Sequence, residues 1–443
     1  MKNVSRVLPC FILILSAIFC RSGLAQQPGD LDLNFGTDGI TMLDVNSMGL
    51  DDRVNIVYVF EAGDLLIGGR VRTAGFPPYE SDKLLGKFDV DGSLVTGFGQ
   101  SGFSIINLDE YSQSFSAIHV TTDGKILCGG TSNQSGTYQF MLAQFEANGQ
   151  INSDFGVDGF VYTTPIMTGG VLTTMTTNTQ GEVLAIGSGG SNILIAKYNS
   201  DGTLESNFGS SGIINLDYGQ IESSYDMGLQ TNGKMLIVGN QAVSGEPVDA
   251  LVSRVNSDGS LDTDFNDIGW INLALSDNID QCSSVIELAD EKILVSGITV
   301  ESEISSFEIF AVRLMPDGSY DSSFGTNGIA KYDIGAGDDY TTDMILQPDG
   351  KAIIGGSAND GNDNNFCLIR INEDGSLDQS FGNNGVVITE VSTGNDGIAS
   401  MVLQADGKLV VAGSARVGTN DDIALARYHT GLNLSVNDRD EKP

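Results

Sequence analysis

One unit is repeated along the chain, and this repetition restricts the folds that the chain can adopt. A string of the type Leu-Asp-x-x-Phe-Gly-x-x-Gly recurs seven times with variations. Its phenylalanines are Phe35, Phe98, Phe155, Phe208, Phe265, Phe324 and Phe381. The longest interval, 63 residues, separates Phe35 from Phe98, and the shortest, 53 residues, separates Phe155 from Phe208. Equivalent units of this length pack against their neighbours in a stack or in a ring.

Each unit contains four short apolar runs, separated by turn-forming residues. In the sixth unit these runs cover residues 329–334, 342–347, 351–356 and 366–372. Short runs rich in Val and Ile, bounded by Asp-Gly or Asn-Gly, are typical of strands in antiparallel hairpins, and no helical periodicity competes with them. Seven such units predict an all-β fold, a seven-bladed β-propeller with four antiparallel strands per blade. A linear β-solenoid is the alternative, although its coils are usually shorter than this unit.

Two aligned positions, eight residues apart, carry opposite charges in most units. The pairs include Arg254 and Asp262, Arg313 and Asp321, and Arg370 and Asp378. Positions that flank a turn in this way face each other across a hairpin, where opposite charges stabilise a sheet by roughly 0.2–1 kcal/mol. We therefore interpret this ring of acids as structural ion pairs and not as catalytic groups. Arg427 has no acid eight residues later, so we predict that it pairs with Asp32 and that the N-terminal segment closes the ring.

The two ends of the chain differ from the repeats. Residues 1–25 combine the basic Lys2 and Arg6 with an apolar stretch and small residues before Gln26, which is typical of a secretory signal peptide. That stretch is shorter than the ~20 residues that span a membrane, and we expect no transmembrane segment. Residues 26–431 form the predicted propeller, and residues 432–443 are a polar tail. We expect a secreted or extracytoplasmic protein, in the periplasm, at the cell surface or released.

The chain carries a formal net charge of −36, with 58 acidic and 22 basic residues and only two histidines. Such a charge disfavours nucleic acids and anionic lipid surfaces as partners, because both bind cationic proteins. His119 and His429 lie far apart in the sequence and no Cys-x-x-Cys occurs, so we expect no transition-metal site. Cys128 and Cys367 occupy apolar positions of the repeat, where we expect free thiols in the core.

Two sets of connections vary from unit to unit and share one face of the predicted propeller. Variable loops on a rigid scaffold are where binding sites are usually built, so their acids are the candidate binding residues. They are Asp51, Asp52, Asp109, Glu110, Asp338, Asp339, Asp360, Asp363, Asp421 and Asp422. A solvated acidic surface without a ligand explains the same residues. Calcium is the natural cation for clustered carboxylates, with residues 359–364 as the best local candidate, although the spacing of an EF-hand is missing.

The repeated strings also carry a family resemblance. They include Gln-Ala-Asp-Gly-Lys-Leu-Val-Val-Ala-Gly at 404–413 and Ile-Ala-Leu-Ala-Arg-Tyr at 423–428. With these strings the chain resembles the delta-60 repeat family of exported bacterial proteins over about residues 29–431. The resemblance implies a β-propeller outside the cytoplasm and no general biochemical activity. The third unit departs from the pattern, since Gln180, Gly181 and Glu182 replace Asp-Gly-Lys.

No constellation of catalytic residues emerges from the sequence, and no cofactor is implied. We therefore predict a monomeric, non-catalytic binding or scaffold module whose variable acidic loop face binds a protein or a glycan. The alternative is a secreted hydrolase that uses carboxylates in the loops or in the central channel. An enzyme would show one pocket that breaks the sevenfold regularity and holds two close acids with perturbed pKa values.

Overall fold

The computed structural model describes residues 26–45, 49–73, 81–108, 114–133, 136–166, 169–243, 245, 247–301, 306–432 and 434. Its regular elements are 28 strands, so the described part of the chain is all-β, as predicted. None of these residues belongs to a helix long and apolar enough to cross a membrane.

Within the described chain the strands form five four-stranded sheets and one eight-stranded sheet. The first sheet comprises β2 (Asp52–Val59), β3 (Leu65–Arg72), β4 (Ser81–Phe88) and β5 (Phe103–Ile106). The second comprises β6 (Phe115–Val120), β7 (Ile126–Ser132), β8 (Gln139–Phe145) and β9 (Phe160–Thr163). The third comprises β10 (Val171–Thr177), β11 (Val183–Gly189), β12 (Asn192–Tyr198) and β13 (Ile213–Leu216). A further one comprises β22 (Asp339–Leu346), β23 (Ala352–Asn359), β24 (Asn364–Ile371) and β25 (Val386–Thr389).

The eight-stranded sheet contains two antiparallel groups of four strands. One group is β14 (Ile221–Leu229), β15 (Met235–Ala242), β16 (Val248–Val255) and β17 (Trp270–Leu273). The other is β18 (Ile279–Glu287), β19 (Ile293–Val300), β20 (Glu308–Leu314) and β21 (Ile329–Tyr332). A single parallel residue pair, Val248 with Ile279, joins β16 to β18 and so links the two groups.

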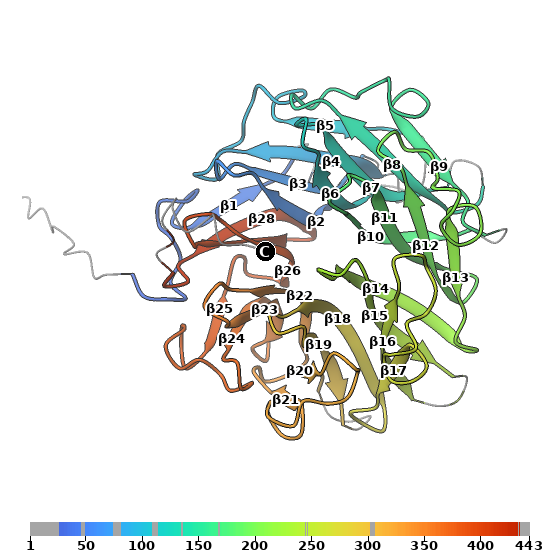
Figure 1. Ribbon diagram of the computed structural model, residues 1–443. Coiled ribbons are helices and arrows are strands. Elements are labelled where there is room, and N and C mark those ends of the chain that lie inside the picture. Colours follow the sequence, from blue (N-terminus) through green and yellow to red (C-terminus); the bar gives the residue numbers. More distant parts are fainter. Residues whose placement is uncertain are drawn as a thin grey trace, which may run out of the picture.

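The last sheet joins the two ends of the described chain. It consists of β26 (Asp396–Leu403), β27 (Leu409–Val417), β28 (Asn420–Tyr428) and β1 (Ile40–Leu43). β1 pairs antiparallel with β28, with Ile40 opposite Ala426, and Figure 1 shows the blue β1 beside the red β28. The sequence unit is therefore offset from the sheet by one strand, because the first apolar run of each unit completes the sheet of the preceding unit.

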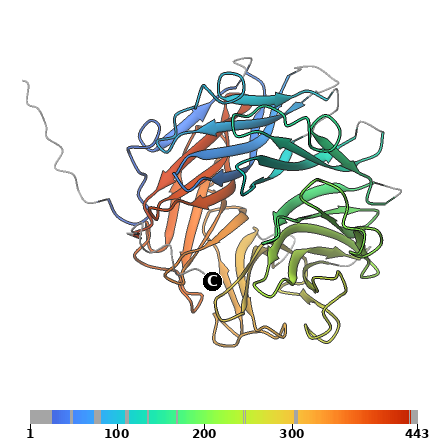
Figure 2. The same cartoon turned by 45° about the horizontal axis from the view of Figure 1, so that its top comes forward.

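The sheets stand around a central axis, as the blades of a β-propeller do. The first strand of each group of four, from β2 and β6 to β22 and β26, lies nearest the axis (Figure 1). We call these the inner strands. The short fourth strands, such as β5, β9 and β21, lie at the rim, and the tilted view in Figure 2 shows the same arrangement. A closed ring leaves only short, protected sheet edges.

The core lies between neighbouring sheets. In one cluster, Leu236 of β15 and Val252 of β16 pack with Val295 of β19 and Phe310 of β20, and all four are fully buried. Successive side chains of a strand point to opposite sides of its sheet, so each sheet contributes to two such clusters. Burial of each aliphatic side chain stabilises the fold by ~1.5–3 kcal/mol.

The three cysteines in the described residues are Cys128, Cys282 and Cys367, and all are buried and free. Burial raises the pKa of each of these thiols. They act as small core hydrophobes. For Cys128 and Cys367 this confirms the prediction from the repeat positions.

Candidate functional site

One face of the ring holds the Asp-Gly-Lys turns and the Leu-Asp-x-x-Phe-Gly strings, and we call it the turn face. Here Arg254 Nε lies 2.5 Å from Asp262 Oδ2, and Arg313 Nε lies 2.8 Å from Asp321 Oδ2. The lysine of the Asp-Gly-Lys turn reaches the same carboxylate, as shown by Lys234 Nζ at 2.7 Å from Asp262. The sequence analysis missed this third member, although each lysine occupies a fixed place in the repeat.

The same three-residue arrangement closes the ring. Arg370 Nε lies 2.8 Å from Asp378, and Lys351 Nζ also lies 2.8 Å from it. In the last sheet, Arg427 Nη2 lies 2.8 Å from Asp32 Oδ2, and Lys408 Nζ lies 3.0 Å from the same oxygen. Asp32 thus supplies, from the start of the described chain, the acid that the seventh unit lacks.

Units that depart from the pattern replace the pair in a compensating way. Where an acid stands at the lysine position, the ion pair forms directly between that acid and the cation of the hairpin. Lys87 Nζ lies 3.3 Å from Asp64, and Lys197 Nζ lies 2.8 Å from Glu182. Where both hairpin residues are neutral, Asn152 donates a 2.6 Å hydrogen bond to Gln144. The turn face therefore preserves a structural contact in each of these units.

The turn face also locks each sheet to the next. Arg313 donates through Nη1 to the backbone carbonyl of Glu373, and its guanidinium lies 4.9 Å from the centre of the Phe324 ring. That ring packs against Gly375 of the following sheet, where a Cβ would come within 2.9 Å of it. Gly375 has φ +84°, a conformation that favours glycine. The uniform residues of this face hold the ring together.

The opposite face, which we call the loop face, carries the connections between successive groups of strands and between second and third strands. Asp52 and Asp339 stand at the start of inner strands and are fully buried. Asp339 accepts hydrogen bonds from the N–H groups of Ile334 at 2.7 Å and Gly335 at 3.1 Å, and Asp52 accepts one from Val45 at 2.8 Å. Burial raises the pKa of Asp52 to about 6 and also raises that of Asp339.

These two candidates are therefore loop anchors and not exposed ligands, which corrects the sequence-based assignment. The same kind of backbone hydrogen bond is made by equivalent acids that the sequence analysis did not single out. They are Glu222, Asp280 and Asp396. An apolar strand that starts with an acid after a loop is the sequence signal that identifies them.

Two other candidates lie at the junction between the first and last sheets. Asp421 is nearly buried and forms ion pairs with Arg53 at 2.5 Å and Arg416 at 2.8 Å. Asp51 lies 2.9 Å from Arg72 and accepts a 3.2 Å hydrogen bond from the Asp421 N–H. Both acids are thus held by cations. The adjacent Asp422 has a raised pKa because of burial and the charges of Asp44 and Asp421.

The remaining described candidates lie in separate loops. Asp338 accepts a 3.0 Å hydrogen bond from the Phe307 N–H. Asp360 accepts the N–H groups of Asn362 at 2.9 Å and Asp363 at 3.2 Å, which is a turn held by its own side chain. Asp109 and Glu110 lie outside the described residues. Of the described candidates, four therefore lie together at the junction of the first and last sheets, namely Asp51, Asp52, Asp421 and Asp422, and the others lie in different loops.

Among the described residues, no group of three or more His, Cys, Asp or Glu side chains is placed to hold a metal ion. His119 lies 2.8 Å from the Thr177 hydroxyl, and His429 lies 3.7 Å from Asp32, so the two histidines belong to different sheets.

Two acids near the axis were missed by the sequence analysis. A β-bulge directly precedes Asp226 of β14 and Asp343 of β22. Asp226 accepts hydrogen bonds from the Ser284 hydroxyl at 2.9 Å and the Val285 N–H at 3.0 Å, both on the next inner strand. Asp343 accepts the Met401 N–H at 2.7 Å in the same way. These carboxylates link neighbouring inner strands.

Burial raises the pKa values of both acids. That of Asp343 rises to about 7, and the charge of Asp226 adds to the effect of burial, while the N–H groups of Met401 and Met344 oppose it. The pKa of Asp226 is also raised by burial, against the hydrogen bonds from Val285 and Ser284. Acids with perturbed pKa values are candidates for catalysis. The hydrogen bonds to the next inner strand, however, already give Asp226 and Asp343 a structural role.

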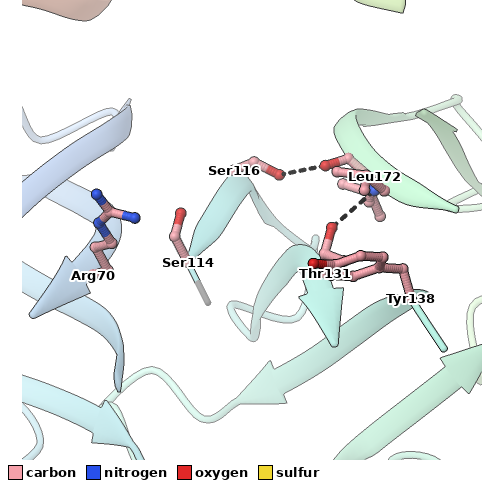
Figure 3. A pocket seen from close by; sticks show the side chains of 7 residues that line it. Arg70, Ser114, Ser116, Thr131, Tyr138 and Leu172 are labelled. Atoms are coloured by element: carbon pink, nitrogen blue, oxygen red, sulfur yellow. Dashed lines mark hydrogen bonds between the residues drawn. The ribbon is translucent and has the colours of Figure 1, made fainter. Parts of the chain in front are cut away.

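One pocket opens on the loop face, where the first three sheets meet. Its volume is about 280 Å³, and it is lined by Arg70, Ser114, Ser116, Thr131, Tyr138, Val171 and Leu172. Figure 3 shows the Arg70 guanidinium directed toward Ser114 from the neighbouring sheet.

The wall of the pocket is fixed by hydrogen bonds between sheets. Thr131 Oγ1 accepts the Leu172 N–H at 2.9 Å, and the Ser116 hydroxyl donates to the Leu172 carbonyl at 3.3 Å (Figure 3). Tyr138 and Val171 are 51% and 45% exposed and provide an apolar rim. The pocket thus combines a cation, hydroxyl groups and exposed apolar surface.

Comparison with known families agrees with this architecture. Five segments match the family model described as "Domain of unknown function (DUF5122) beta-propeller", at residues 121–155, 230–265, 288–324, 347–381 and 404–434. These segments are β-propeller repeats. The match supports the expectation of a β-propeller that the family resemblance implied. The five matched segments correspond to five of the seven sequence units. No curated protein matches the sequence.

Three solved structures are similar to this chain at low sequence identity. Drosophila Plexin A in complex with Semaphorin 1b is 9% identical, with a TM-score of 0.47 over 90% of this chain and 88% of that chain. A PL25 ulvan lyase bound to -[GlcA(1-4)Rha3S]- is 11% identical, with a TM-score of 0.48 over 88% and 96%. Chaetomium thermophilum Sqt1 bound to the N-terminus of ribosomal protein L10 is 11% identical, with a TM-score of 0.44 over 86% and 97%. The similarity concerns the fold alone.

Proposed function

We propose that this protein is an extracytoplasmic, seven-bladed β-propeller of the delta-60 type that binds a saccharide and does not catalyse a reaction on it. The blade count adds the five four-stranded sheets to the two antiparallel halves of the eight-stranded sheet. It equals the number of repeats in the sequence. One observation carries the functional proposal, namely the pocket on the loop face, because the turn face is occupied by contacts between sheets.

The shape of the pocket favours a small ligand or the end of a chain over a protein surface. Pockets for small molecules are concave and measure ~300–1,000 Å³, whereas protein interfaces bury ~800 Å² of each partner. A volume of about 280 Å³ is close to the lower end of that range. Hydroxyl groups of Ser116 and Thr131 and the exposed ring of Tyr138 suit a sugar, which offers hydroxyl groups and an apolar ring face.

The lining of the pocket supports binding without hydrolysis. Hydrolysis of a glycosidic bond normally uses two carboxyl groups ~5–10 Å apart, and the described residues that line this pocket include no Asp or Glu. The alternative function, a hydrolase with its active site in the central channel, would use described acids near the axis such as Asp226 and Asp343. Their oxygens accept backbone hydrogen bonds from the next inner strand, which gives them a structural role.

Affinity electrophoresis tests the proposal, with gels that contain starch, xylan, pectin or alginate. The full chain, Tyr138→Ala and the turn-face control Asp91→Asn are run side by side, and reducing ends are measured after prolonged incubation. We expect at least one polysaccharide to retard the wild-type protein and Asp91→Asn, but not Tyr138→Ala, with no new reducing ends. New reducing ends would overturn the non-catalytic assignment. Equal retardation of Tyr138→Ala would overturn the assignment of binding to the pocket. No retardation of any of the proteins would overturn the proposal that the ligand is a saccharide.

A further inference from the structure

A row of aliphatic residues crosses the loop-face end of the eight-stranded sheet, and we call it the aliphatic row. Ile221 of β14 lies opposite Ala242 of β15, which lies opposite Val248 of β16. The parallel pair of Val248 with Ile279 carries the row into β18, where Ile279 lies opposite Val300 of β19. Ile221 and Ile279 are 53% and 37% exposed, Ala242 and Val248 are half-buried, and Val300 is buried. The row thus presents apolar side chains to solvent.

The equivalent rows of three other sheets are polar. In each sheet the row contains the residue that directly precedes the buried acid of the inner strand, so register identifies it. These rows are Asp51/Arg72/Ser81, Asp338/Asn359/Asn364 and Asn395/Arg416/Asp421. The fold therefore does not require apolar residues at this edge. An exposed apolar patch at a place where other repeats carry polar groups indicates a contact surface.

Aromatic side chains extend this apolar surface on both sides. Tyr225, at the bulge of β14, is 38% exposed, and its hydroxyl accepts a 3.4 Å hydrogen bond from Asn240. On the other side, Phe307 directly precedes β20, and its ring centre lies 5.5 Å from that of Tyr340 at the start of β22. The surface therefore reaches from the fourth group of strands to the sixth.

The charged residues that follow members of the aliphatic row along the chain are acids. They are Glu222 after Ile221, Asp249 after Val248 and Asp280 after Ile279. Burial raises the pKa of Asp249, and the charge of Asp280 raises it further. Burial also raises the pKa of Glu222, and the charge of Asp217 adds to this effect. Negative charge therefore accumulates beside the row.

The basic residues of these strands are used on the turn face. From the start of β13 to the end of β19 the sequence holds only three of them, Lys234, Arg254 and Lys292. Each lies 2.5–2.9 Å from a carboxylate of the turn face. Lys331 of β21 reaches the loop face at the rim, where it pairs with Glu301. The acids beside the aliphatic row thus receive little compensation from their own sheet.

We propose that this surface docks a basic protein segment, with the aliphatic side chains of that segment on the row and its lysine or arginine side chains beside Asp217, Asp249 and Asp277. Asp217 and Asp277 are exposed in the loops that lead to Ile221 and Ile279. A second copy of this chain, with its net charge of −36, or an anionic lipid surface would add negative charge to the site. The inference does not rest on the proposed saccharide pocket, which lies at the first three sheets.

Fluorescence anisotropy with a labelled peptide tests the inference. The probe is a peptide in which three leucines alternate with four lysines. One control peptide has serine in place of leucine, and the other has glutamate in place of lysine. The proteins are the full chain, Ile221→Ser and Asp277→Lys. Their matched controls are Ile388→Ser, at a 46% exposed position of β25, and Asp154→Lys on the turn face.

We expect the wild type to bind the lysine–leucine peptide at least about tenfold more tightly than either control peptide. Ile221→Ser should weaken binding about three- to tenfold, because part of the burial of one aliphatic side chain is lost. Asp277→Lys should weaken it at least about threefold at low salt and less at high salt. Ile388→Ser and Asp154→Lys should bind as the wild type does. If Ile221→Ser does not fold, Ile279→Ser takes its place.

Four outcomes would contradict the inference. Equal affinity for the serine peptide would show attraction by net charge alone, and equal affinity for the glutamate peptide or no binding would exclude a basic partner. Unchanged affinity in Ile221→Ser would exclude the aliphatic row as the site. A dimer of the free protein in sedimentation experiments, dissociated by Ile221→Ser, would assign the surface to a second copy. The polysaccharide gels decide the proposed function independently of these results.

Discussion

Asp32 and Arg427 are 395 residues apart in the sequence, yet Asp32 Oδ2 lies 2.8 Å from Arg427 Nη2 and 2.9 Å from its Nε. Asp32 is fully buried. Burial acts to raise its pKa, but the hydrogen bonds from Lys408 and Asn34 and the charge of Arg427 outweigh it and lower the pKa to about 2. The pair joins the start of the described chain to β28 and thereby fixes β1 at the edge of the last sheet.

We predict that Asp32→Ala lowers the free energy of unfolding by about 3–5 kcal/mol, because it leaves the Arg427 charge buried without its partner. Asp321→Ala is the matched control, since it breaks the same pair with Arg313 inside a continuous part of the chain. Urea unfolding should give a comparable loss for both variants. Hydrogen exchange of the β1 amides, Ile40–Leu43, should accelerate in Asp32→Ala alone. Equal protection of β1 in the two variants would contradict the ring-closing role.

A second prediction concerns the dependence of stability on pH. An unfolded Asp has a pKa of ~3.9, whereas that of Asp343 is about 7 in the folded protein. The folded state therefore binds more protons between these values, and the contribution of Asp343 is present below pH ~4 and lost as the pH rises to about 7. Asp32 acts in the opposite sense, because its contribution is present above pH ~4 and is lost as the pH falls toward 2.

Calorimetry from pH 5 to pH 8 checks this dependence. We expect the unfolding temperature of the wild type to fall over this range, and the fall to be smaller in Asp343→Asn. Part of the fall should remain in that variant, because the pKa of Asp52 is also raised, to about 6. Asp360→Asn is the control, since backbone hydrogen bonds lower the pKa of this exposed acid and it titrates below the range. An unchanged slope in Asp343→Asn would show that this carboxyl is already ionised at pH 5.

The repeat made most of the fold predictable. Turn chemistry and charge recur at fixed positions, so aligning the units within one chain was enough to expect the hairpins and the contact between Arg427 and Asp32. The offset between unit and sheet was not visible, because the short first run of each unit has no local feature that says which sheet it joins. Strand pairings such as those of β21 with β20 and of β1 with β28 show it.

The pocket was not predicted, because it depends on register and on contacts between sheets. Arg70, Thr131 and Leu172 belong to three different sheets, and nothing in the sequence alone shows that they line one cavity. The candidate acids were chosen for charge and loop position, and burial decided against Asp52 and Asp339. One signal was available in the sequence, since Arg70 is a charged residue at a position where aligned units carry Ser, Asn or Ile.

A third prediction compares two glycines with similar backbone conformations. Gly375 and Gly124 have φ +84° and +81°, so alanine at either position incurs a cost of about 1 kcal/mol. A Cβ at Gly375 would also lie 2.9 Å from the Phe324 ring, whereas no atom of the described residues lies within 4 Å of one at Gly124. We expect Gly375→Ala to lower the free energy of unfolding by about 1–3 kcal/mol more than Gly124→Ala, as measured in urea. Equal losses would mean that Phe324 moves aside at no cost.

The last prediction follows from the compensating changes on the turn face. Asp64 and Glu182 both stand at the position that is Lys in other units, and they pair with Lys87 and Lys197. The two units differ at the hairpin position that is Asp in other units. This position holds Glu205 in the unit of Glu182 and the apolar Val95 in the unit of Asp64. Replacing the first acid by lysine should therefore have different effects in the two units.

Asp64→Lys should destabilise the fold by about 1 kcal/mol, because it removes an ion pair and places two lysines together with no hairpin acid between them. Glu182→Lys should stay within about 0.5 kcal/mol of the wild type, since Glu205 can then accept both lysines as the aspartates of other units do. A double-mutant cycle in urea provides the decisive comparison. Asp64→Lys should cost less in a Val95→Asp background than in the wild type. An equal cost in both backgrounds would show that the lysines of the turn face do not depend on the hairpin acid.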